Sequence, residues 1–170
     1  CLPCDRMKRR RRVSHFALGI ARIPATFRRM PRFPLSLSIV SMNEETNLRR
    51  CLDSAADLVS EIVVVDSGST DGTLDVARQY GARTQHQSWL GHRDQKQVAL
   101  DLCTQPWVLV MDCHEQLSPE LRASIEQFFA CDEASRPDGA SMNRRTWFLG
   151  TWIRHGDWYP DTKLRLFRRD

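Results

Sequence analysis

The 170-residue sequence lacks an apolar run long enough to cross a membrane. A weakly apolar stretch near the N-terminus, residues 13–27, is interrupted by Arg22 and Pro24, whereas a spanning helix needs about 20 consecutive apolar residues. The stretch follows a basic run, as in a signal peptide, but its apolar core is short and no convincing cleavage site follows. Internal repeats and low-complexity segments are also lacking. The sequence therefore argues against a membrane-spanning helix here and against a repeat protein.

Cysteine is present, but in no pattern typical of a disulfide framework. The six cysteines have no regular spacing, and the chain is longer than the small secreted scaffolds that depend on disulfides. Cys1 and Cys4 have CxxC spacing, but no second pair completes a zinc site. We therefore expect a reducing environment, which is the cytoplasm or the inner face of the cell membrane.

Outside the N-terminal segment, acidic residues outnumber basic ones. Residues 1–34 contain ten Lys or Arg and one acid, whereas residues 35–170 contain 15 basic and 20 acidic residues. A folded domain with a slight negative charge argues against a nucleic-acid partner. We predict that residues 1–34 are a basic extension that is disordered or not native, and that residues 35–170 form the domain. Because Met30 directly precedes the first strand-like segment, we expect the natural start there.

From residue 35 onward, strand and helix patterns alternate along the chain. Apolar or alternating runs predict strands at residues 35–40, 62–65, 82–87 and 107–111, and helical spacing predicts helices at 48–58, 74–80, 96–103 and 118–130. Ser118 followed by Pro119 is typical of a helix start, and Gly81 of a helix end. This order predicts an α/β fold with a mostly parallel, Rossmann-like sheet and flanking helices.

Polar side chains follow three of the predicted strands. Asn43 and Glu44 come after the first, Asp66 after the second and Asp112 after the fourth. Ligands of open α/β sheets bind beyond the carboxyl ends of the strands, so we expect a site there. Neither a Walker A loop nor GxGxxG is present. Residues 66–73 (DSGSTDGT) alone fit equally well an ordinary turn with a helix cap.

Together, these segments occur in a recognisable order. NEE stands at residues 43–45, VVDSGSTDGT at 64–73, GHRDQK at 91–96, FLGTWIRHGDWYPD at 148–161 and LRLFR at 164–168. From about Leu35 to Arg169 the chain resembles family-2 glycosyltransferases, and among them bacterial lipopolysaccharide-core β-glucosyltransferases. The resemblance implies a GT-A fold that is truncated at its C-terminal end. It also implies inverting transfer of a hexose from UDP-hexose to a hydroxyl of a glycan or lipid-linked core acceptor.

The resemblance assigns the nucleotide-binding residues. Asp66 is expected to bind the uracil, Lys96 to lie near the diphosphate, and Asp112 to contact the ribose or a metal ion. The full expected set of donor-binding residues is Asn43, Glu44, Asp66, Ser67, Gly68, Lys96 and Asp112.

A divalent cation, Mg²⁺ or Mn²⁺, is expected with Asp112 and His114 as ligands. The family pattern after this strand is D-A-D-E, whereas this chain has D-C-H-E at residues 112–115. Mg²⁺ prefers oxygen ligands, and imidazole suits Mn²⁺ or softer ions better. The substitution therefore predicts either a changed metal preference or a weakened site.

The aromatic block at 148–161 is expected on the acceptor side, where aromatic rings stack on sugars and arginines bind anionic groups. Burial in the core is the alternative for some of these rings. The expected acceptor-side residues are Trp152, Arg154, His155, Trp158 and Asp161. We expect the catalytic base beyond Asp170, with Asp157 and Asp161 as the remaining candidates within the chain, and peripheral membrane association through the lipid-linked acceptor.

Two other functions remain open at this point. The first is a truncated, non-catalytic remnant that binds a nucleotide without turnover, which His114 and the C-terminal end of the chain favour. The second is a nucleotidyltransferase, but residues 41–47 (SMNEETN) lack the glycine-rich phosphate loop expected after its first strand.

Overall fold

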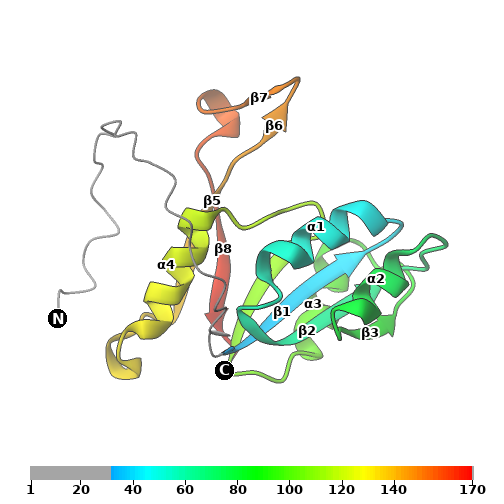
Figure 1. Cartoon of the computed structure of the whole chain (residues 1–170), viewed down its shortest axis with the longest axis horizontal. Helices are drawn as coiled ribbons and strands as arrows, with labels where there is room; N and C mark the ends of the chain where they lie inside the picture. Colours follow the sequence, from blue (N-terminus) through cyan, green and yellow to red (C-terminus); the bar gives the residue numbers. More distant parts are fainter. Residues whose placement is uncertain (1–31, 170) are drawn as a thin grey trace, which may run out of the picture.

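The computed structural model describes residues 32–169, which form a six-stranded sheet with helices on both faces (Figure 1). The strand order in this sheet is β3-β2-β1-β4-β8-β5. Its strands are β1 (Phe33–Ser41), β2 (Val59–Asp66), β3 (Arg83–His86), β4 (Trp107–Asp112), β5 (Gly139–Arg144) and β8 (Asp161–Arg168). The helices are α1 (Glu45–Ala55), α2 (Thr73–Gln79), α3 (His92–Asp101) and α4 (Pro119–Ala130), with short 3-10 turns η2 (Glu133–Ser135) and η3 (Gly156–Trp158).

The strand directions bring several loops to one edge of the sheet. β1 pairs in parallel with both β2 and β4, and β3 pairs in parallel with β2. β8 is antiparallel to β4, and β5 is antiparallel to β8, so β5 runs in the same direction as β1–β4. The carboxyl ends of these five strands therefore lie at the same edge, which we call the carboxyl edge.

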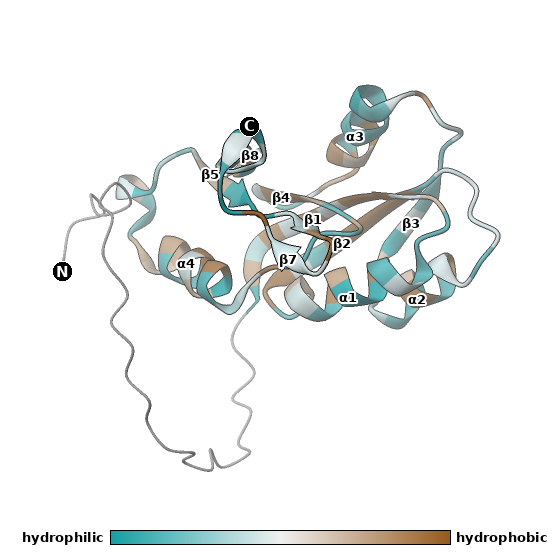
Figure 2. Ribbon diagram, turned by 90° about the horizontal axis from the view of Figure 1, so that it is seen from above, coloured by the Kyte–Doolittle hydropathy of each residue, from teal (hydrophilic) through white to brown (hydrophobic). Residues whose placement is uncertain are grey.

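Alternation along the strands divides the core between the two faces. Leu35, Leu37 and Ile39 of β1 are buried in the larger core cluster, which includes residues of α1, α2 and α4. The smaller cluster, on the other face, contains Val63 and Val108 with residues of α3. Viewed from above, α3 lies on one side of the apolar strands and α1 and α2 on the other (Figure 2). The fully buried β-branched run of β2 is explained by helices that cover both faces.

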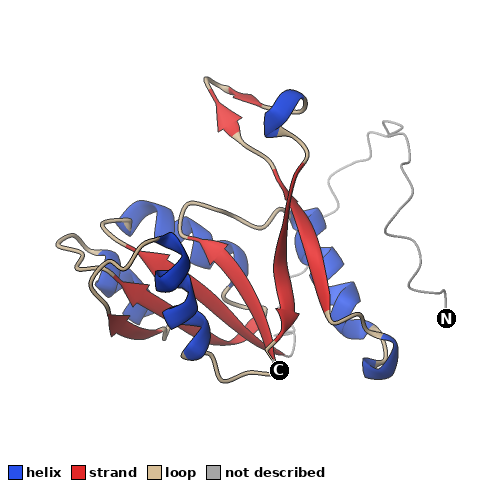
Figure 3. Ribbon diagram, turned by 180° about the vertical axis from the view of Figure 1, so that it is seen from behind, coloured by secondary structure: helices blue, strands red, loops and turns tan. Residues whose placement is uncertain are grey.

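Residues 145–160 form a separate projection, which we call the aromatic arm. Its two short strands, β6 (Trp147–Phe148) and β7 (Thr151–Trp152), pair antiparallel. The arm rises from the end of β5 and returns into β8, away from the helices (Figure 3). Trp147 and Trp152 are half exposed although their rings contact each other at a centroid distance of 5.1 Å.

The predicted α/β class is confirmed, with a mostly parallel sheet and flanking helices. Ser118 caps α4 by accepting a hydrogen bond from the Leu121 N–H, and Gly81 follows α2 with a φ of 70°. β1 begins at Phe33, inside the segment that we assigned to the extension, and residues 1–31 lie outside the described part. α3 begins at His92, a turn earlier than predicted, and strands β5–β8 were not predicted.

Between residues 32 and 169, no helix has the length and apolar character needed to cross a bilayer.

Replacing Leu37 by alanine tests the core. Leu37 is fully buried in β1, the strand that pairs with both β2 and β4, and a buried Leu→Ala change costs about 2–5 kcal/mol. We expect that loss in the free energy of unfolding measured with urea. The matched control is Leu149→Ala, since Leu149 is 87% exposed in the aromatic arm and surface changes stay within about 0.5 kcal/mol. Equal losses in the two variants would contradict the core assignment.

Candidate functional site

Two loops at the carboxyl edge are joined into one unit by side-chain hydrogen bonds. The first follows β1 and the second follows β2, and these strands are neighbours in the sheet. Asn43 is central because its N–H donates to the Ser69 Oγ at 2.8 Å and its Oδ1 accepts from the Thr70 N–H at 2.8 Å. Three further bonds join Glu44 N to Thr73 Oγ1, Glu45 N to Asp71 Oδ2, and Gly72 N to Glu45 Oε2. The two loops are therefore linked at five points.

Asp66, the last residue of β2, holds the second loop through its carboxylate. Its carboxylate is almost completely buried and accepts hydrogen bonds from the N–H groups of Gly68 and Ser69, at 2.9 and 2.8 Å, and from the Ser41 and Ser69 hydroxyls. Burial alone would raise the pKa of Asp66, but these hydrogen bonds outweigh it and hold the pKa below its usual value. Gly68 has a φ of 104° in this turn, a conformation that other residues rarely adopt.

The buried side-chain amide of Gln95, on α3, also holds this loop. Gln95 is fully buried, and its Nε2 donates to the Ser67 Oγ at 3.1 Å and to the Gln87 carbonyl at 2.9 Å. Its Oε1 accepts from the Leu90 N–H. Because Gln95 is fixed on both sides, the position of the following residue, Lys96, is fixed as well.

Asp112, at the end of β4, is held between two cations. Its Oδ1 lies 2.6 Å from the Lys96 Nζ, and its Oδ2 lies 3.1 Å from Arg165 Nη2. The same Arg165 nitrogen is 2.6 Å from Glu115 Oε1, and the other Glu115 oxygen accepts from the Asp112 N–H. Burial would raise the pKa of Asp112, but Lys96 and then Arg165 lower it below its usual value. Asp112 therefore stays ionised and fully paired.

A pocket of about 320 Å³ opens beside this ion-pair network. Four basic side chains line it around a single carboxylate: Lys96, Arg144, Lys163 and Arg165, with Asp112. Each of these four cations is also paired with a carboxylate, that of Asp112, Glu115 or Asp161. The basic side chains therefore exceed the acidic ones by one, four against three, and basic side chains bind anions with several oxygens, phosphates above all.

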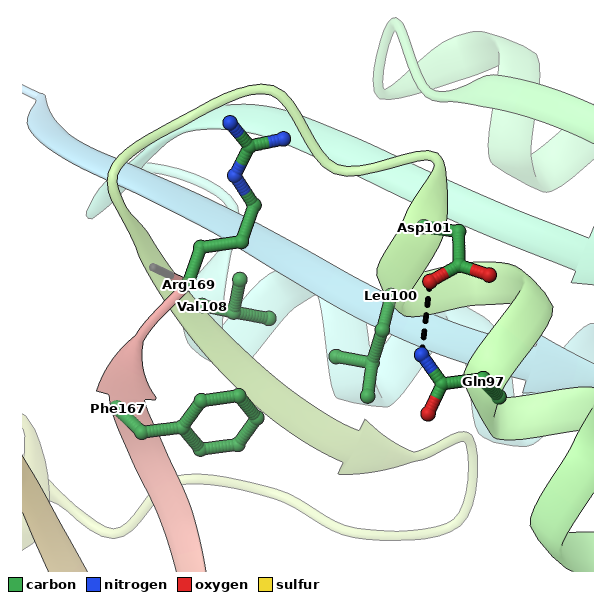
Figure 4. Close-up of a pocket in the computed structure, with 6 residues that line it drawn as sticks. All are labelled: Gln97, Leu100, Asp101, Val108, Phe167 and Arg169. Carbon is green, nitrogen blue, oxygen red and sulfur yellow. Dashed lines mark hydrogen bonds between the residues drawn. The ribbon is translucent and has the colours of Figure 1, made fainter.

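A larger pocket, of about 500 Å³, lies elsewhere (Figure 4). Val108 and Phe167 form its apolar wall, and Gln97 donates to Asp101 at 2.7 Å on its α3 side. Val108 stands near the beginning of β4, so this pocket is at the opposite end of the strands from Asp112. None of the predicted site residues lines it, and we assign it no role in the chemistry of the carboxyl edge.

The predicted metal ligands, Asp112 and His114, have different surroundings. Within residues 32–169, the group of metal-ligating side chains at this edge is Glu44, Cys113 and His114, whose ligand atoms lie within 4.8 Å of one another. Asp112 is outside that group and is paired with cations. Mg²⁺ demands oxygen ligands in octahedral geometry. The sulfur of Cys113 and the nitrogen of His114 therefore do not fit Mg²⁺.

Cys113 is a buried free thiol next to Cys51. Burial, and then the nearby Glu44 and Asp112 carboxylates, raise the pKa of Cys113 to about 12. Burial, and then Cys113 and Glu115, raise the pKa of Cys51 to about 12 as well. Both thiols are therefore neutral at physiological pH in the metal-free protein.

The predicted acceptor-side residues lie in or beside the aromatic arm. Trp152, Arg154, His155 and Trp158 are exposed there, and Trp158 contacts Phe148 at a centroid distance of 5.4 Å. The rings of Trp152 and Trp158 are half exposed, so the core alternative does not hold for these two residues.

Asp161 and Asp157 differ in their surroundings. Asp161 begins β8, where Lys163 lies 2.9 Å and Arg144 lies 2.6 Å from its carboxylate oxygens. Lys163, and then Arg144, lower the pKa of Asp161, which works against a role as a general base. Asp157 is exposed in η3 of the arm.

The structure adds site residues that the sequence reasoning missed. Arg165, Glu115, Arg144 and Lys163 complete the network around Asp112, and Gln95 and Ser41 support the loops. The alternation of residues 163–167 (KLRLF), with Leu166 buried, was a strand signal that predicts one common face for Lys163 and Arg165.

The fold is that of an α/β protein with a mostly parallel sheet, and the polar residues described above gather at its carboxyl edge, where open α/β sheets bind their ligands. The model of the family described as glycosyl transferase family 2 matches residues 36–169. The chain belongs to this family.

Two relatives and one solved structure show the extent of the likeness. The chain is 35% identical to the lipopolysaccharide core biosynthesis glycosyltransferase LpsC of Rhizobium meliloti over 145 residues, which cover 82% of this chain and 53% of LpsC. It is 40% identical to an uncharacterized glycosyltransferase of Rickettsia felis over 102 residues, covering 60% of this chain and 36% of the relative. The chain thus spans about half of LpsC and a smaller share of the second relative.

The crystal structure of S. aureus TarS 1–349 matches with a TM-score of 0.54 and 18% identity, covering 79% of this chain and 47% of the TarS chain. At this identity the likeness is one of fold alone. It agrees with the predicted GT-A class, which the family membership and the sheet confirm.

Replacing Asp66 by asparagine tests the loop anchor. The amide is neutral and cannot accept all the hydrogen bonds of the carboxylate, so we expect a loss of about 1–3 kcal/mol in unfolding free energy at pH 7. The folded-state pKa of Asp66 is lowered, so its contribution is present above the unfolded pKa of about 3.9 and is lost as the pH falls through the folded value.

The difference between wild type and Asp66→Asn in urea unfolding should therefore shrink below about pH 4. Asp157→Asn, at an exposed position, is the control and should change stability little at either pH. A difference between wild type and Asp66→Asn that is small at pH 7 would show that the carboxylate does not anchor the loop.

Proposed function

We propose that the protein transfers a hexose from UDP-hexose, with inversion, to a hydroxyl of a glycan or lipid-linked core acceptor. The observation that carries the proposal is the four-cation pocket beside Asp112 at the carboxyl edge. A diphosphate is the part of a nucleotide sugar that such a pocket suits best. The membership in glycosyl transferase family 2 supports the reaction class, and the similarity to LpsC supports a lipopolysaccharide-core acceptor.

On the donor side, the nucleoside lies against the paired loops after β1 and β2. Asn43, Glu44, Ser67 and Gly68 belong to these loops, which the cross-loop hydrogen bonds hold in one shape. Because the oxygens of Asp66 are occupied by the loop, we propose that Asp66 contributes to uracil binding by fixing the loop backbone.

The diphosphate lies in the cationic pocket, next to Lys96 and Arg165. As the bond between the sugar and the diphosphate breaks, negative charge builds up on the departing oxygens, and prealigned cations stabilise it. Both cations are paired with Asp112, so the diphosphate exchanges one anionic partner for another. This step depends on the chain's own basic residues.

On the acceptor side, the exposed rings of the aromatic arm stack on sugar faces, while Arg154 and His155 bind anionic groups. The arm leaves the sheet at the end of β5, which lies at the carboxyl edge. A general base must deprotonate the acceptor hydroxyl on the face of the sugar opposite to the diphosphate. Because Asp161 is paired with two cations, we favour a base outside residues 32–169, with exposed Asp157 as the candidate within them.

A lipid-linked acceptor brings the protein to the inner face of the membrane. Exposed Trp side chains together with Arg residues are typical of surfaces that lie at a membrane interface, and the aromatic arm combines both. Peripheral association through the arm is therefore part of the proposal.

A nucleotide-binding remnant without turnover is the second candidate, because both oxygens of Asp112 are paired and no hard-metal site is assembled in the described residues. Calorimetric titration with UDP, followed by measurement of UDP released from UDP-glucose in the presence of core oligosaccharide, separates the two. Binding with release supports the transferase, binding without release supports the remnant, and no binding contradicts both.

Replacing Lys96 by glutamine tests the diphosphate site. A charge-assisted hydrogen bond contributes about 1.5–3 kcal/mol, so we expect UDP affinity to fall by about tenfold or more. Arg78→Gln is the control, because Arg78 is exposed on α2 and pairs with Asp75. An unchanged dissociation constant for UDP in Lys96→Gln would place the diphosphate elsewhere.

Replacing Trp152 by alanine tests the acceptor side. We expect binding of a lipopolysaccharide-core oligosaccharide to weaken by about 0.5–1.5 kcal/mol, with UDP affinity unchanged. Trp89→Ala is a matched control, since Trp89 is half exposed beyond β3, at the opposite end of the strand order from β5. Oligosaccharide titrations that give one affinity for wild type and Trp152→Ala would remove Trp152 from the acceptor site.

A further inference from the structure

Three residues with different ligand atoms meet at the carboxyl edge: Glu44, Cys113 and His114. A carboxylate oxygen, a thiol sulfur and an imidazole nitrogen lie within 4.8 Å of one another there. We propose that these three residues bind a divalent ion that prefers sulfur and nitrogen ligands, Zn²⁺ or Co²⁺, in place of Mg²⁺.

The sheet explains why these residues meet. β1 and β4 are adjacent and parallel, and Val40 is in register with Asp112. Glu44 follows β1 and precedes α1, while Cys113 and His114 follow β4, so all three residues lie beyond the carboxyl ends of two adjacent strands. The cross-loop bond from Glu44 N to Thr73 Oγ1 fixes the backbone of Glu44 at 2.8 Å.

The alternation of side chains at the end of β4 separates this group from Asp112. Cys113 belongs to the core cluster on the α1 face. Asp112 instead lines the cationic pocket together with Val110, which packs in the cluster on the α3 face. A hard-ion site built on Asp112 would have to displace Lys96 and Arg165, whereas the Glu44–Cys113–His114 group involves neither cation.

The ligand chemistry favours a borderline or soft ion. Zn²⁺ is bound by thiolate, imidazole and carboxylate ligands, and sites with three protein ligands keep a fourth position for water or another ligand. Mg²⁺ and Ca²⁺ are bound through oxygens. Glu44 retains capacity as a ligand, because its hydrogen bond from Asn47 Nδ2 involves Oε2, and exposed His114 gives an ion a route of entry.

Titration of the chain with Co²⁺, without nucleotide, tests the proposal. We expect a sulfur-to-cobalt charge-transfer band in the near ultraviolet, which Zn²⁺ abolishes by displacement and which excess Mg²⁺ leaves unchanged. His114→Ala, at an exposed position, should weaken Co²⁺ binding by about tenfold or more. Cys113→Ser should remove the band, and Cys103→Ser, which changes an equally buried thiol outside the group, should keep it.

The variant His114→Asp keeps a metal ligand at position 114 but replaces its nitrogen by oxygen, so it tests whether the ligand atom decides which ion binds. We expect Zn²⁺ affinity to fall and Mn²⁺ affinity to rise in this variant, because a carboxylate replaces the imidazole. The proposal is overturned if wild type shows no charge-transfer band, if the band survives in Cys113→Ser, or if Mg²⁺ displaces Co²⁺ as readily as Zn²⁺ does. Since Cys113 is buried, His114→Ala decides the matter should Cys113→Ser fail to fold. No nucleotide is present, so the result is independent of the proposed transfer reaction.

Discussion

The buried carboxylate of Asp66 controls the shape of the carboxyl edge on the side of α1 and α2. It holds the N–H groups of Gly68 and Ser69, and the Ser69 hydroxyl then accepts from the N–H of Asn43. The loop after β1 is therefore set by a side chain of the neighbouring strand. An unpaired buried carboxylate would cost several kcal/mol, and the hydrogen bonds that prevent this cost are the ones that form the loop. The hydrogen bonds that satisfy the Asp66 carboxylate therefore also fix the shape of the loops after β1 and β2.

On the α3 side, the corresponding constraint is electrostatic. Asp112 is ionised because Lys96 and Arg165 compensate its burial, and Arg165 is held in turn by Glu115. Removing one member of such a network leaves a partly buried charge without its partner, which is more costly than the net gain from forming the pair. Lys96 is partly exposed and Arg165 is mostly buried, and carboxylates hold both cations in position at the end of β4.

The sequence predicted the parts of the fold that depend on local pattern. The apolar runs of β1, β2 and β4 and the helix signals at Ser118 and Gly81 are properties of a few adjacent residues. β8 was not predicted although residues 163–167 alternate, because its pairing partner β4 lies about 50 residues earlier in the chain. The role of Arg165 depends on that long-range pairing. The position of Asp66 was predictable from the end of its strand, but whether its oxygens face the loop or a ligand depends on backbone conformation beyond the strand.

The end of β4 places two different side chains on opposite faces of the sheet: the charged Asp112 and the thiol Cys113. Because successive side chains point to opposite faces, Asp112 contributes to the cationic pocket on the α3 side while Cys113 lies on the α1 side. The two sides therefore use different side chains, although the Asp112 carboxylate contributes to the raised pKa of Cys113. A histidine at position 114 leaves the ion pairs of Asp112 with Lys96 and Arg165 in place. The ion pairs of Asp112 with Lys96 and Arg165 involve no residue of the Glu44–Cys113–His114 group, so a changed metal preference is compatible with an unchanged ion-pair network.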